Sequence, residues 1–429
     1  MRLQLHWQIL IALVLAVIAG RLSGTDGELL GMAVYPVYVF IGVLFMNALK
    51  MIIVPLVMSS IITGICGIGG TSGLGRLGGK TLLFYMTTSL LAILTGLLIV
   101  NLLNPGLVNG EPAREILGMN SDELMAVTDK VEGRSMSDLS DVFLSMIPAN
   151  VIAAAAEGKM LGLIFFSLLF GYFITRVDKE KSELLTRFWQ GVADVMMAMT
   201  SLIMKFAPLG IFGLVAKTIA GIGPDQMDEL VVSLGTFTLS VLLALLIHVV
   251  VTLPLMLAFV GKVNPLAMYR AMAPALLTAF STASSSATLP LTMECVEDNA
   301  KVSVRTSSFV LPLGATVNMD GTALYECVAA MFIAQAFGLE LSFVTQFTVV
   351  LVALLTSIGV AGVPAASLVA IPRSLRTLGV PMAAIGLPLA VDRILDMFRT
   401  AVNVFSASWG AVMIARTDGE EGSLQESIC

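Results

Sequence analysis

The region 391–403 carries charged and amide side chains at helical spacing. Asp392, Asp396, Arg399 and Asn403 follow one another at intervals of four, three and four residues, so all four share one face of a helix. The guanidinium fork of arginine matches a carboxylate with two hydrogen bonds, and Asp396, one turn earlier, suits an ammonium group. The face therefore predicts a site for a zwitterion with a further acid group. The alternative is an Asp396–Arg399 ion pair that only stabilises the packing of the helices.

Asp320 lies inside the apolar stretch 308–337. An ionised aspartate at the centre of a bilayer costs about 2.5–3.5 kcal/mol on insertion scales, and no basic residue stands within one helical turn of it. Hard oxygen ligands with one negative charge suit a cation such as Na⁺. The alternative is an Asp320 that is protonated or hydrogen-bonded to a neighbouring helix. The oxygen donors nearby are the side chains of Thr316, Asn318 and Thr322 and the carbonyls beside Gly314 and Gly321.

Two apolar segments in the C-terminal half are interrupted by small residues. Phe280–Pro290 is rich in serine and threonine, and Ser357–Ser367 contains glycine and proline. Irregular backbone at membrane depth is tolerated only where it is buried or lines a cavity, and a pair of interrupted segments indicates a transporter's binding site. Both segments therefore predict re-entrant helical hairpins, and the amides of the serine-rich tip are available to an anion. The alternative for that tip is a small-residue face for helix packing.

The composition sets the environment in which these groups must be positioned. Of 429 residues 57% are apolar and 13% charged, with a mean hydropathy of +0.93. A soluble domain has about 25% charged residues, so the chain is predicted to be an all-α polytopic membrane protein. The net charge of −6 argues against a nucleic-acid partner. The four cysteines show no paired spacing, and two histidines are too few for a histidine-based metal site.

Apolar segments of about 20 residues are long enough to cross a bilayer as helices. The short basic loop that holds Arg76 and Lys80 is expected in the cytoplasm, which places both termini there and the acidic, exposed loop 105–142 outside. The first segment is interpreted as a retained helix and 417–429 as a polar cytoplasmic tail. The segments run roughly over 6–22, 30–64, 78–104, 151–177, 188–222 and 228–261.

Four ordered motifs resemble those of the dicarboxylate/amino acid:cation symporters, which include the excitatory amino acid transporters. They are Ser-Ser-Ser-Ala-Thr-Leu-Pro (284–290), Asn-Met-Asp-Gly-Thr (318–322), Gly-Val-Pro (362–364) and Asp-Met-Phe-Arg-Thr-Ala-Val-Asn (396–403). The resemblance implies eight transmembrane helices plus two re-entrant hairpins, in a homotrimer that works by an elevator mechanism.

The resemblance also divides the chain. Scaffold elements are expected at about 1–75 and 145–225, and transport-domain elements at about 76–104 and 226–416. The whole is expected to form one integral membrane unit, in the inner (plasma) membrane of a prokaryote.

The resemblance assigns binding roles as well. Arg399 is expected to bind the side-chain carboxylate of the substrate, Asp396 its amino group, and Thr322 and Asn403 its remaining carboxylate and main-chain groups. The substrate site is completed by Ser284, Ser285, Ser286, Val363 and Thr400. Tyr85, Thr88 and Ser89, with Asn318 and Asp320, resemble one sodium site; Gly314 and Asn403 resemble part of a second; Thr316 and the carbonyls of Ser357, Ile358 and Val360 resemble a third.

The chain departs from the family pattern at three positions. Ala407 stands where an aspartate ligand of sodium is usual, and Ser406 and Ser408 are poor replacements. Ala283 and Met397 occupy the two positions where a second arginine is usual. Potassium counter-transport is therefore not assumed. Asp392 is left without an arginine from the hairpin, and is expected to titrate or to pair with a bound ion.

The predicted function is symport of aspartate or glutamate with Na⁺, or with H⁺ as the alternative coupling ion. In the family, carriers of neutral amino acids lack the arginine and dicarboxylate carriers usually lack the aspartate, whereas this chain has both. That interpretation assumes an unpaired Asp396 in the empty site. The alternative of the same fold is a symporter of fumarate, succinate or malate. Nothing resembles the filter of a channel, and His248 has no serine or acidic partner at a spacing typical of a hydrolase.

Overall fold

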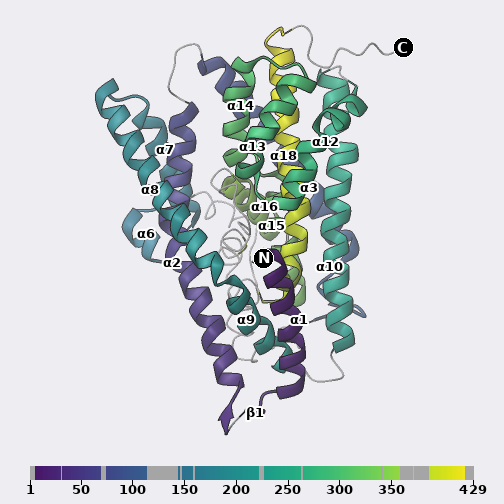
Figure 1. The fold of residues 1–429 in the computed structure, drawn as a ribbon. Coiled ribbons are helices and arrows are strands. Elements are labelled where there is room, and N and C mark those ends of the chain that lie inside the picture. The colour runs from purple at the N-terminus through teal and green to yellow at the C-terminus, as the bar shows by residue number, and fades with distance from the viewer. Residues whose placement is uncertain are drawn as a thin grey trace.

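The computed structural model consists almost entirely of helices (Figure 1). Besides the helices, the described part of the chain holds two short β-hairpins. The described residues are 5–29, 31–68, 74–113, 144, 147–157, 160–221, 227–261, 264–339, 342–357, 371 and 386–420.

The N-terminal half begins with two helices joined by a β-hairpin. Its elements are α1 (Leu5–Ser23), β1 (Glu28–Leu29), β2 (Met32–Ala33), α2 (Tyr35–Ile68), α3 (Leu74–Leu103), β3 (Leu107–Val108), β4 (Glu111–Pro112), α6 (Val151–Glu157), α7 (Met160–Ile174), α8 (Lys179–Lys205) and α9 (Ala207–Gly221).

The C-terminal half contains three described π-helical segments, η3 to η5, among its α-helices. Its elements are α10 (Met227–Ile247), η3 (His248–Thr252), α11 (Leu253–Met256), η4 (Leu257–Gly261), α12 (Pro265–Thr282), α13 (Ser285–Glu294), η5 (Cys295–Asn299), α14 (Val304–Val317), α15 (Asp320–Ala336), α16 (Phe343–Ser357) and α18 (Gly386–Thr417).

Two described helical stretches are long and apolar enough to cross a membrane, Leu77–Leu103 and Asp228–Phe259. Lys179–Ile203 and Ala207–Gly221 qualify only together, and they bend by 58° at the break between them. These findings agree with a helical membrane protein. The eight spans and the two re-entrant hairpins expected from the sequence stay predictions.

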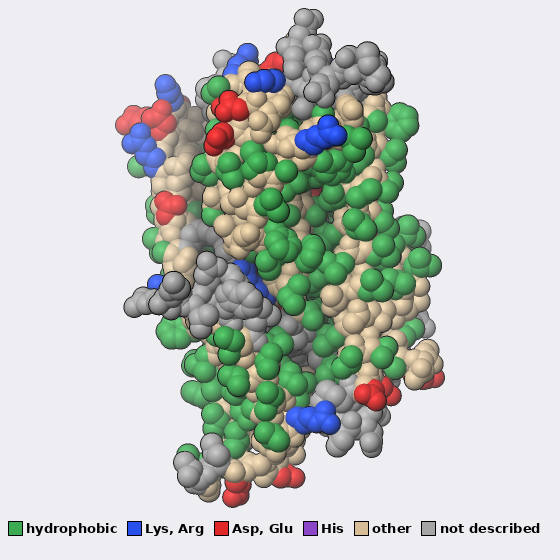
Figure 2. Space-filling model, turned by 45° about the vertical axis from the view of Figure 1, so that its right-hand side comes forward, with side chains coloured by type: hydrophobic (Ala, Val, Ile, Leu, Met, Phe, Trp, Pro, Cys, Tyr) green, Lys and Arg blue, Asp and Glu red, His purple; other side chains and the backbone are tan. Residues whose placement is uncertain are grey.

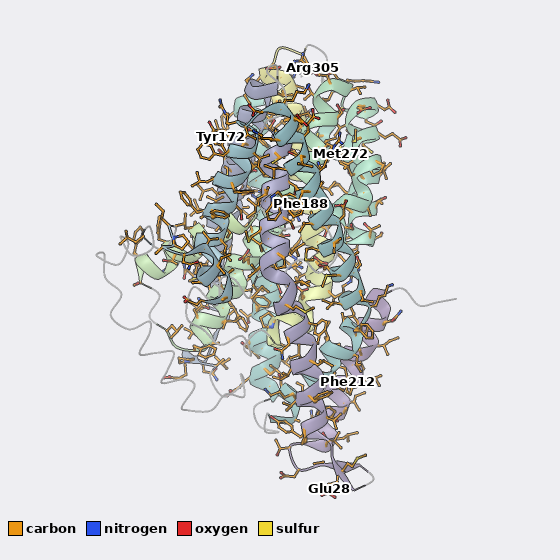
Figure 3. The ribbon with its side chains drawn as sticks, turned by 90° about the vertical axis from the view of Figure 1, so that its left-hand side faces the viewer. Glu28, Tyr172, Phe188, Phe212, Met272 and Arg305 are labelled. Carbon is orange, nitrogen blue, oxygen red and sulfur yellow. The ribbon has the colours of Figure 1, made fainter. Side chains whose placement is uncertain are left out.

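The surface is apolar over much of its height. Leu22 is 82% exposed and Phe259 77% exposed, and Figure 2 shows hydrophobic side chains over the middle of one face, with most charged side chains towards its two ends. Glu28 and Arg305 lie at opposite ends of the molecule (Figure 3). This distribution suits a molecule with lipid around its middle and water at its ends.

The packing is centred on α15, whose residues from Asp320 to Ala336 are all buried. Helices α3, α10, α16 and α18 pack around it, and α18 runs along the middle of the bundle (Figure 1). Helix α1 packs along α9, while α2 contacts α7, α8 and α9. A helix buried on every side needs no polar face, and α15 beyond its first turn is mostly apolar, although Glu326 and Gln335 are also buried in it.

The serine-rich segment forms a helix–turn–helix. Helix α12 ends at Thr282, the next residue Ala283 has a left-handed φ of 49°, and Ser284 caps α13 by accepting a hydrogen bond from Ala287 N at 3.2 Å. A serine at this position satisfies a backbone donor that the first turn leaves open. Helices α12 and α13 pack against each other, so the turn predicted at this segment is present.

The segment after α3 differs from the expected exposed loop. Over 105–113 the strands β3 and β4 pair as a hairpin. Gly106 N donates to Gln335 Oε1 at 3.1 Å, and Ser233 Oγ donates to the carbonyl of Pro105 at 3.0 Å. Side chains of α15 and α10 thus hold the start of this segment in place. The polar composition of the segment does not reveal these contacts. Residues 114–142 lie outside the described part.

The end of α18 is tied to two other elements by polar contacts. Glu420 accepts hydrogen bonds from Ser303 N at 3.0 Å, Ser303 Oγ at 2.6 Å and Thr306 Oγ1 at 2.5 Å. Lys80 Nζ pairs with Asp418 at 2.8 Å. Partial burial works to raise the pKa of Glu420, but the hydrogen bonds from Ser303 and Thr306 bring it below its ordinary value.

Candidate functional site

The backbone is irregular where α14 gives way to α15. Asn318 and Met319 leave the helical conformation, with φ/ψ of −97°/82° and −111°/51°. Asp320 is therefore the first residue of α15, fully buried at a helix N-terminus, where backbone N–H groups favour negative charge. The broken helix explains how the carboxylate predicted at membrane depth is stabilised.

Side chains of α3 and α18 reach the Asp320 carboxylate. Ser89 of α3 donates to its Oδ1 at 2.6 Å, Thr88 lies 3.4 Å from the same oxygen, and Ser406 of α18 donates to its Oδ2. Asn318 fits this network when its amide nitrogen faces Asp320 Oδ1 at 3.1 Å and its oxygen accepts from the Ala407 amide at 3.0 Å. We call Thr88, Ser89, His248, Asn318, Asp320 and Ser406 the Asp320 cluster.

His248 is the member of this cluster that the sequence analysis missed. Its Nε2 lies 3.3 Å from Asp320 Oδ2, both side chains are fully buried, and its Nδ1 has no hydrogen-bond partner among the described residues. The two residues are 72 positions apart, so spacing alone could not pair them. Ser406 and His248 each contact the carboxylate, whereas a nucleophilic triad needs a serine that donates to the histidine.

Tyr85 lies next to the cluster but directs its hydroxyl elsewhere. The hydroxyl donates to the carbonyl of Val310 at 2.8 Å. A β-carbon added at Gly314 would lie 2.5 Å from that hydroxyl oxygen and 2.9 Å from the Ala407 β-carbon. Glycine at 314 therefore permits the close approach of α3, α14 and α18 at this point.

A second polar cluster lies on α18. Arg399 Nη2 is 2.8 Å from Asp396 Oδ1 and 3.1 Å from Asp392 Oδ1, and the guanidinium carbon lies 3.9 Å from the centre of the Tyr325 ring. Arg399 is fully buried, and the two aspartates are 4% exposed. The ion pair offered as the alternative for Asp396 and Arg399 is thus present, and Asp392, for which no arginine was expected from the hairpin, is paired with Arg399 of its own helix.

Arg393 also contacts Asp396, and the sequence analysis missed it. Its Nη1 lies 3.3 Å from Asp396 Oδ2. The carboxylate that was assumed to be unpaired therefore has two guanidinium partners. Residues three positions apart on a helix are neighbours, so the spacing of Arg393 and Asp396 could have predicted their contact. We call Asp392, Arg393, Asp396 and Arg399 the α18 charge cluster.

Asn403 connects α18 to the first turn of α15. Its Oδ1 accepts from Gly321 N at 2.8 Å, and its Nδ2 donates to Thr322 Oγ1 at 3.0 Å. Thr400 is buried beside Arg399. The structure thus brings together the predicted substrate residues Thr322, Asp396, Arg399, Thr400 and Asn403.

The hairpin tip approaches the same part of α18. Phe280, three residues before the turn, packs edge-on against Phe398 with 5.0 Å between ring centres. Ser284 and Ser285 are buried and Ser286 is exposed. Ser408, by contrast, donates to the carbonyl of Val404 within its own helix, at 2.8 Å.

Part of the predicted site lies outside the described residues. This concerns Val363, Ile358 and Val360, and the side chains of Thr316 and Ser357. Ala407 is buried and supplies no carboxylate. Among the residues that the structure does describe, no three histidine, cysteine or acidic side chains gather as a metal site, so the Asp320 cluster offers one carboxylate with hydroxyl and amide oxygens, a donor set for a hard monovalent cation.

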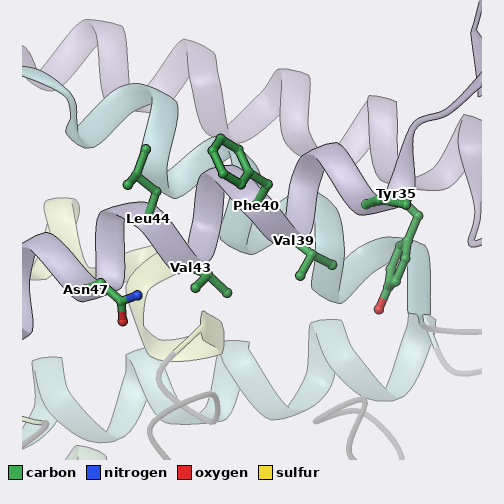
Figure 4. A pocket seen from close by; sticks show the side chains of 7 residues that line it. Tyr35, Val39, Phe40, Val43, Leu44 and Asn47 are labelled. Carbon is green, nitrogen blue, oxygen red and sulfur yellow. The ribbon is translucent and has the colours of Figure 1, made fainter.

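Two described hollows are apolar. A groove of about 570 Å³ follows one side of α2 (Figure 4) and is lined by Tyr35, Pro36, Val39, Phe40, Val43, Leu44 and Asn47. A cavity of about 360 Å³ lies among α10, α12 and α18 and is lined by side chains that include Phe398 and Phe405. Neither hollow presents a charged group, so neither suits a charged substrate.

The comparisons with known proteins agree on one family. The model of the sodium:dicarboxylate symporter family matches residues 5–417. The chain is 34% identical over 421 residues to a proton/sodium-glutamate symport protein of Geobacillus stearothermophilus, which covers 98% of this chain and 96% of that protein. It is 33% identical over 416 residues to the proton/glutamate-aspartate symporter of Escherichia coli (strain K12), covering 97% and 93%.

A eukaryotic relative is similar over nearly the same length. The chain is 36% identical over 423 residues to excitatory amino acid transporter 3 of Homo sapiens, covering 90% of this chain and 80% of that protein. On the family match and these relatives together, the chain belongs to the sodium:dicarboxylate symporter family.

Proposed function

We propose that this chain is a secondary active symporter that imports aspartate or glutamate, driven by a cation gradient. Membership in a family of symporters makes it a transporter and not an enzyme. The relatives' names, which specify glutamate, aspartate or excitatory amino acids, support the substrate class. The observation that carries the proposal is the buried Arg399, held between Asp392 and Asp396 on the helix face that also bears Asn403.

The α18 charge cluster suits an exchange of ion-pair partners. In this proposal a carboxylate of the substrate takes the guanidinium of Arg399, and the carboxylate of Asp396 then receives the substrate's ammonium group. Leaving a buried charge without a partner would cost about 3–5 kcal/mol, and this exchange gives both Arg399 and Asp396 a new partner as their contact with each other is lost. Arg399 also keeps its contact with the ring of Tyr325.

Further substrate contacts are assigned to residues beside this cluster. Thr322 and Asn403, which are hydrogen-bonded to each other, are proposed to hold the substrate's main-chain groups. Thr400 lies beside Arg399 in the same helix. The backbone of Ser284, Ser285, Ser286 and Val363 is proposed to close around the substrate.

The Asp320 cluster is proposed to take the coupling cation. Na⁺ there would be bound by oxygens of Thr88, Ser89, Asn318 and Asp320, with Tyr85 alongside. Thr88 and Ser89 already contact the Asp320 carboxylate, whereas the Asn318 oxygen would reach the ion only after its amide turns over. Na⁺ prefers such oxygen donors. Two further sites remain proposed, one at Gly314 and Asn403 and one at Thr316, Ser357, Ile358 and Val360.

H⁺ is the second candidate for the coupling ion. The bacterial relatives are named proton/sodium or proton symporters. In this chain Nε2 of His248 lies 3.3 Å from Asp320 Oδ2. A proton on His248 would therefore stand beside the same carboxylate that is proposed to bind the cation. Ala407 removes one anionic ligand from the family pattern, which further favours a cycle with fewer sodium ions.

Symport of a plain dicarboxylate stays the alternative. The observation that favours it is the double pairing of Asp396 with Arg393 and Arg399, because a carboxylate so held is less available to an ammonium group. Fumarate and succinate have no ammonium group and do not need it.

Uptake of labelled aspartate into proteoliposomes tests the proposal. An imposed Na⁺ gradient, an imposed H⁺ gradient and no gradient form the three arms, and unlabelled glutamate, fumarate, succinate and serine serve as competitors. We expect gradient-driven uptake that glutamate blocks and serine does not. Arg399→Cys should abolish it, while Arg416→Cys, at the far end of the same helix, should not. Competition by fumarate or succinate without glutamate would overturn the proposal in favour of the dicarboxylate alternative.

The membrane arrangement is part of the proposal. We place the chain in the bacterial inner membrane with both termini in the cytoplasm, as a homotrimer with scaffold elements at about 1–75 and 145–225 and moving elements at about 76–104 and 226–416. The bacterial relatives and the packing of α1 and α2 on α9 support this arrangement. Native mass spectrometry after release from detergent tests it, and a monomer mass alone would contradict the trimer.

A further inference from the structure

Each oxygen of the Asp396 carboxylate faces a different arginine. Oδ1 is 2.8 Å from Arg399 Nη2 and Oδ2 is 3.3 Å from Arg393 Nη1. The Arg393 side chain is 9% exposed and that of Asp396 6% exposed, so the pair lies in a region where solvent screens charges weakly. Arg393 is therefore a second cation at the group to which the proposed function assigns the substrate's ammonium.

The α18 charge cluster contains as many positive as negative groups. Asp392 and Asp396 carry two negative charges, and Arg393 and Arg399 carry two positive ones. If the substrate's carboxylate takes Arg399, Asp396 still has Arg393 beside it. An arriving ammonium group must then share one carboxylate with a guanidinium, and two cations at one carboxylate repel each other.

We propose that Arg393 determines the selectivity between acidic amino acids and plain dicarboxylates, by competing with the substrate's ammonium group for Asp396. The inference rests on the proposed function, because it needs Asp396 to receive that ammonium group. Arg393 lowers the affinity for aspartate and leaves the affinity for succinate, which has a hydrogen in place of the ammonium group, much less affected.

A purely structural ion pair predicts a different result. If Arg393 only fixed the fold of α18, its removal would weaken the binding of aspartate and succinate by the same factor. The ratio of the two dissociation constants separates the two roles, because a general loss of folded protein or of site geometry cancels in it. Specificity is a difference of two affinities, and that difference is what Arg393 is proposed to set.

The test is isothermal titration of the detergent-solubilised protein with L-aspartate and with succinate, at fixed saturating Na⁺ and fixed pH. The variants are Arg393→Gln, which removes the charge, and Arg393→Lys, which keeps it. Arg393→Met retains the aliphatic bulk and repeats the charge removal if the glutamine variant does not fold. Arg416→Gln is the matched control, since it removes an arginine from the last turn of the same helix.

We expect the ratio of the succinate constant to the aspartate constant to rise about tenfold in Arg393→Gln, which corresponds to about 1.4 kcal/mol. In Arg393→Lys and Arg416→Gln it should stay within about threefold of the unmodified protein. An unchanged ratio in both charge-removing variants overturns the inference and leaves the proposed function standing. If the unmodified protein binds neither ligand, the proposed function fails and the inference falls with it.

Discussion

Gly321→Ala tests whether the close approach of α15 to α18 positions the substrate site. A β-carbon at this position would lie 2.6 Å from the Arg399 carbonyl oxygen and 3.0 Å from the Arg399 α-carbon. Both atoms are backbone and cannot rotate away. To bring the first contact to 3.0 Å, the shortest that real β-carbons show, the two helices must separate by about 0.4 Å.

The energetic cost follows from what this separation disturbs. Overpacking costs about 1–3 kcal/mol, and lengthening the 2.8 Å bond from Gly321 N to Asn403 Oδ1 weakens a hydrogen bond worth about 0.5–1.5 kcal/mol. Alanine in a helix returns up to about 1 kcal/mol relative to glycine. The net destabilisation is therefore about 1–3 kcal/mol, and the affinity for aspartate should fall about tenfold because Arg399 and Asn403 move together.

Two measurements and one control check this prediction. The free energy of unfolding is measured by SDS titration in mixed micelles, and the aspartate dissociation constant by isothermal titration. Gly235→Ala on α10 is the control, because a β-carbon there meets nothing within 4 Å; it should leave both quantities unchanged or raise stability slightly. A Gly321→Ala protein as stable as the original, with the same aspartate affinity, would refute the packing argument.

Three further predictions concern charged groups. Arg399→Gln should cost about 3–5 kcal/mol of unfolding free energy, and adding Asp392→Asn should recover about 1–3 kcal/mol of it; additivity within about 0.5 kcal/mol would contradict the ion pair. Asp320→Asn should remove the cation dependence of aspartate binding, and full dependence in titrations with and without Na⁺ would argue against the site. Glu420→Gln should lower the free energy of unfolding at neutral pH. The pKa of Glu420 is lower in the folded protein than its ordinary value of about 4.3, so the ionised carboxylate stabilises the fold fully above that value. This stabilisation is lost as the pH falls through the folded pKa. Unfolding measured across that range should therefore be flatter in the variant, and an unchanged curve would contradict the role of Glu420.

Much of the site could be predicted from the sequence, because the spacing of residues along a helix determines which side chains share a face. Asp392, Asp396, Arg399 and Asn403 were placed on one face by their intervals alone, and the structure has Arg399 in contact with both aspartates. The oxygen donors of Thr316, Asn318 and Thr322 were likewise placed near Asp320 by their short distance from it in the sequence. Both inferences use local rules, and local rules survive without knowledge of the tertiary fold.

The missed residues divide into two kinds. Arg393 lies three residues before Asp396, a spacing that places two side chains in contact on a helix, so the sequence does contain the information for this pair. His248 could not have been found in this way, because Asp320 is 72 residues away on another helix and their contact depends on how α15 packs against the stretch that begins with α10. The hairpin at 105–113 likewise depends on contacts with distant residues, because Gln335 and Ser233 hydrogen-bond to its backbone.

The position of Gly321 gives a physical route for coupling between the two clusters. Asp320, on one side of it, belongs to the Asp320 cluster, while Thr322, on the other, contacts Asn403 of α18. Both residues lie in the first turn of a fully buried helix, so a shift of that turn cannot be taken up by one cluster alone. If the coupling cation binds at Asp320 as proposed, a displacement of that carboxylate also displaces Thr322, the partner of Asn403, and a substrate that moves Asn403 acts on Asp320 in turn. Linkage requires the two effects on affinity to be equal whatever the route, and the shared helical turn is the route that we propose for the coupling itself.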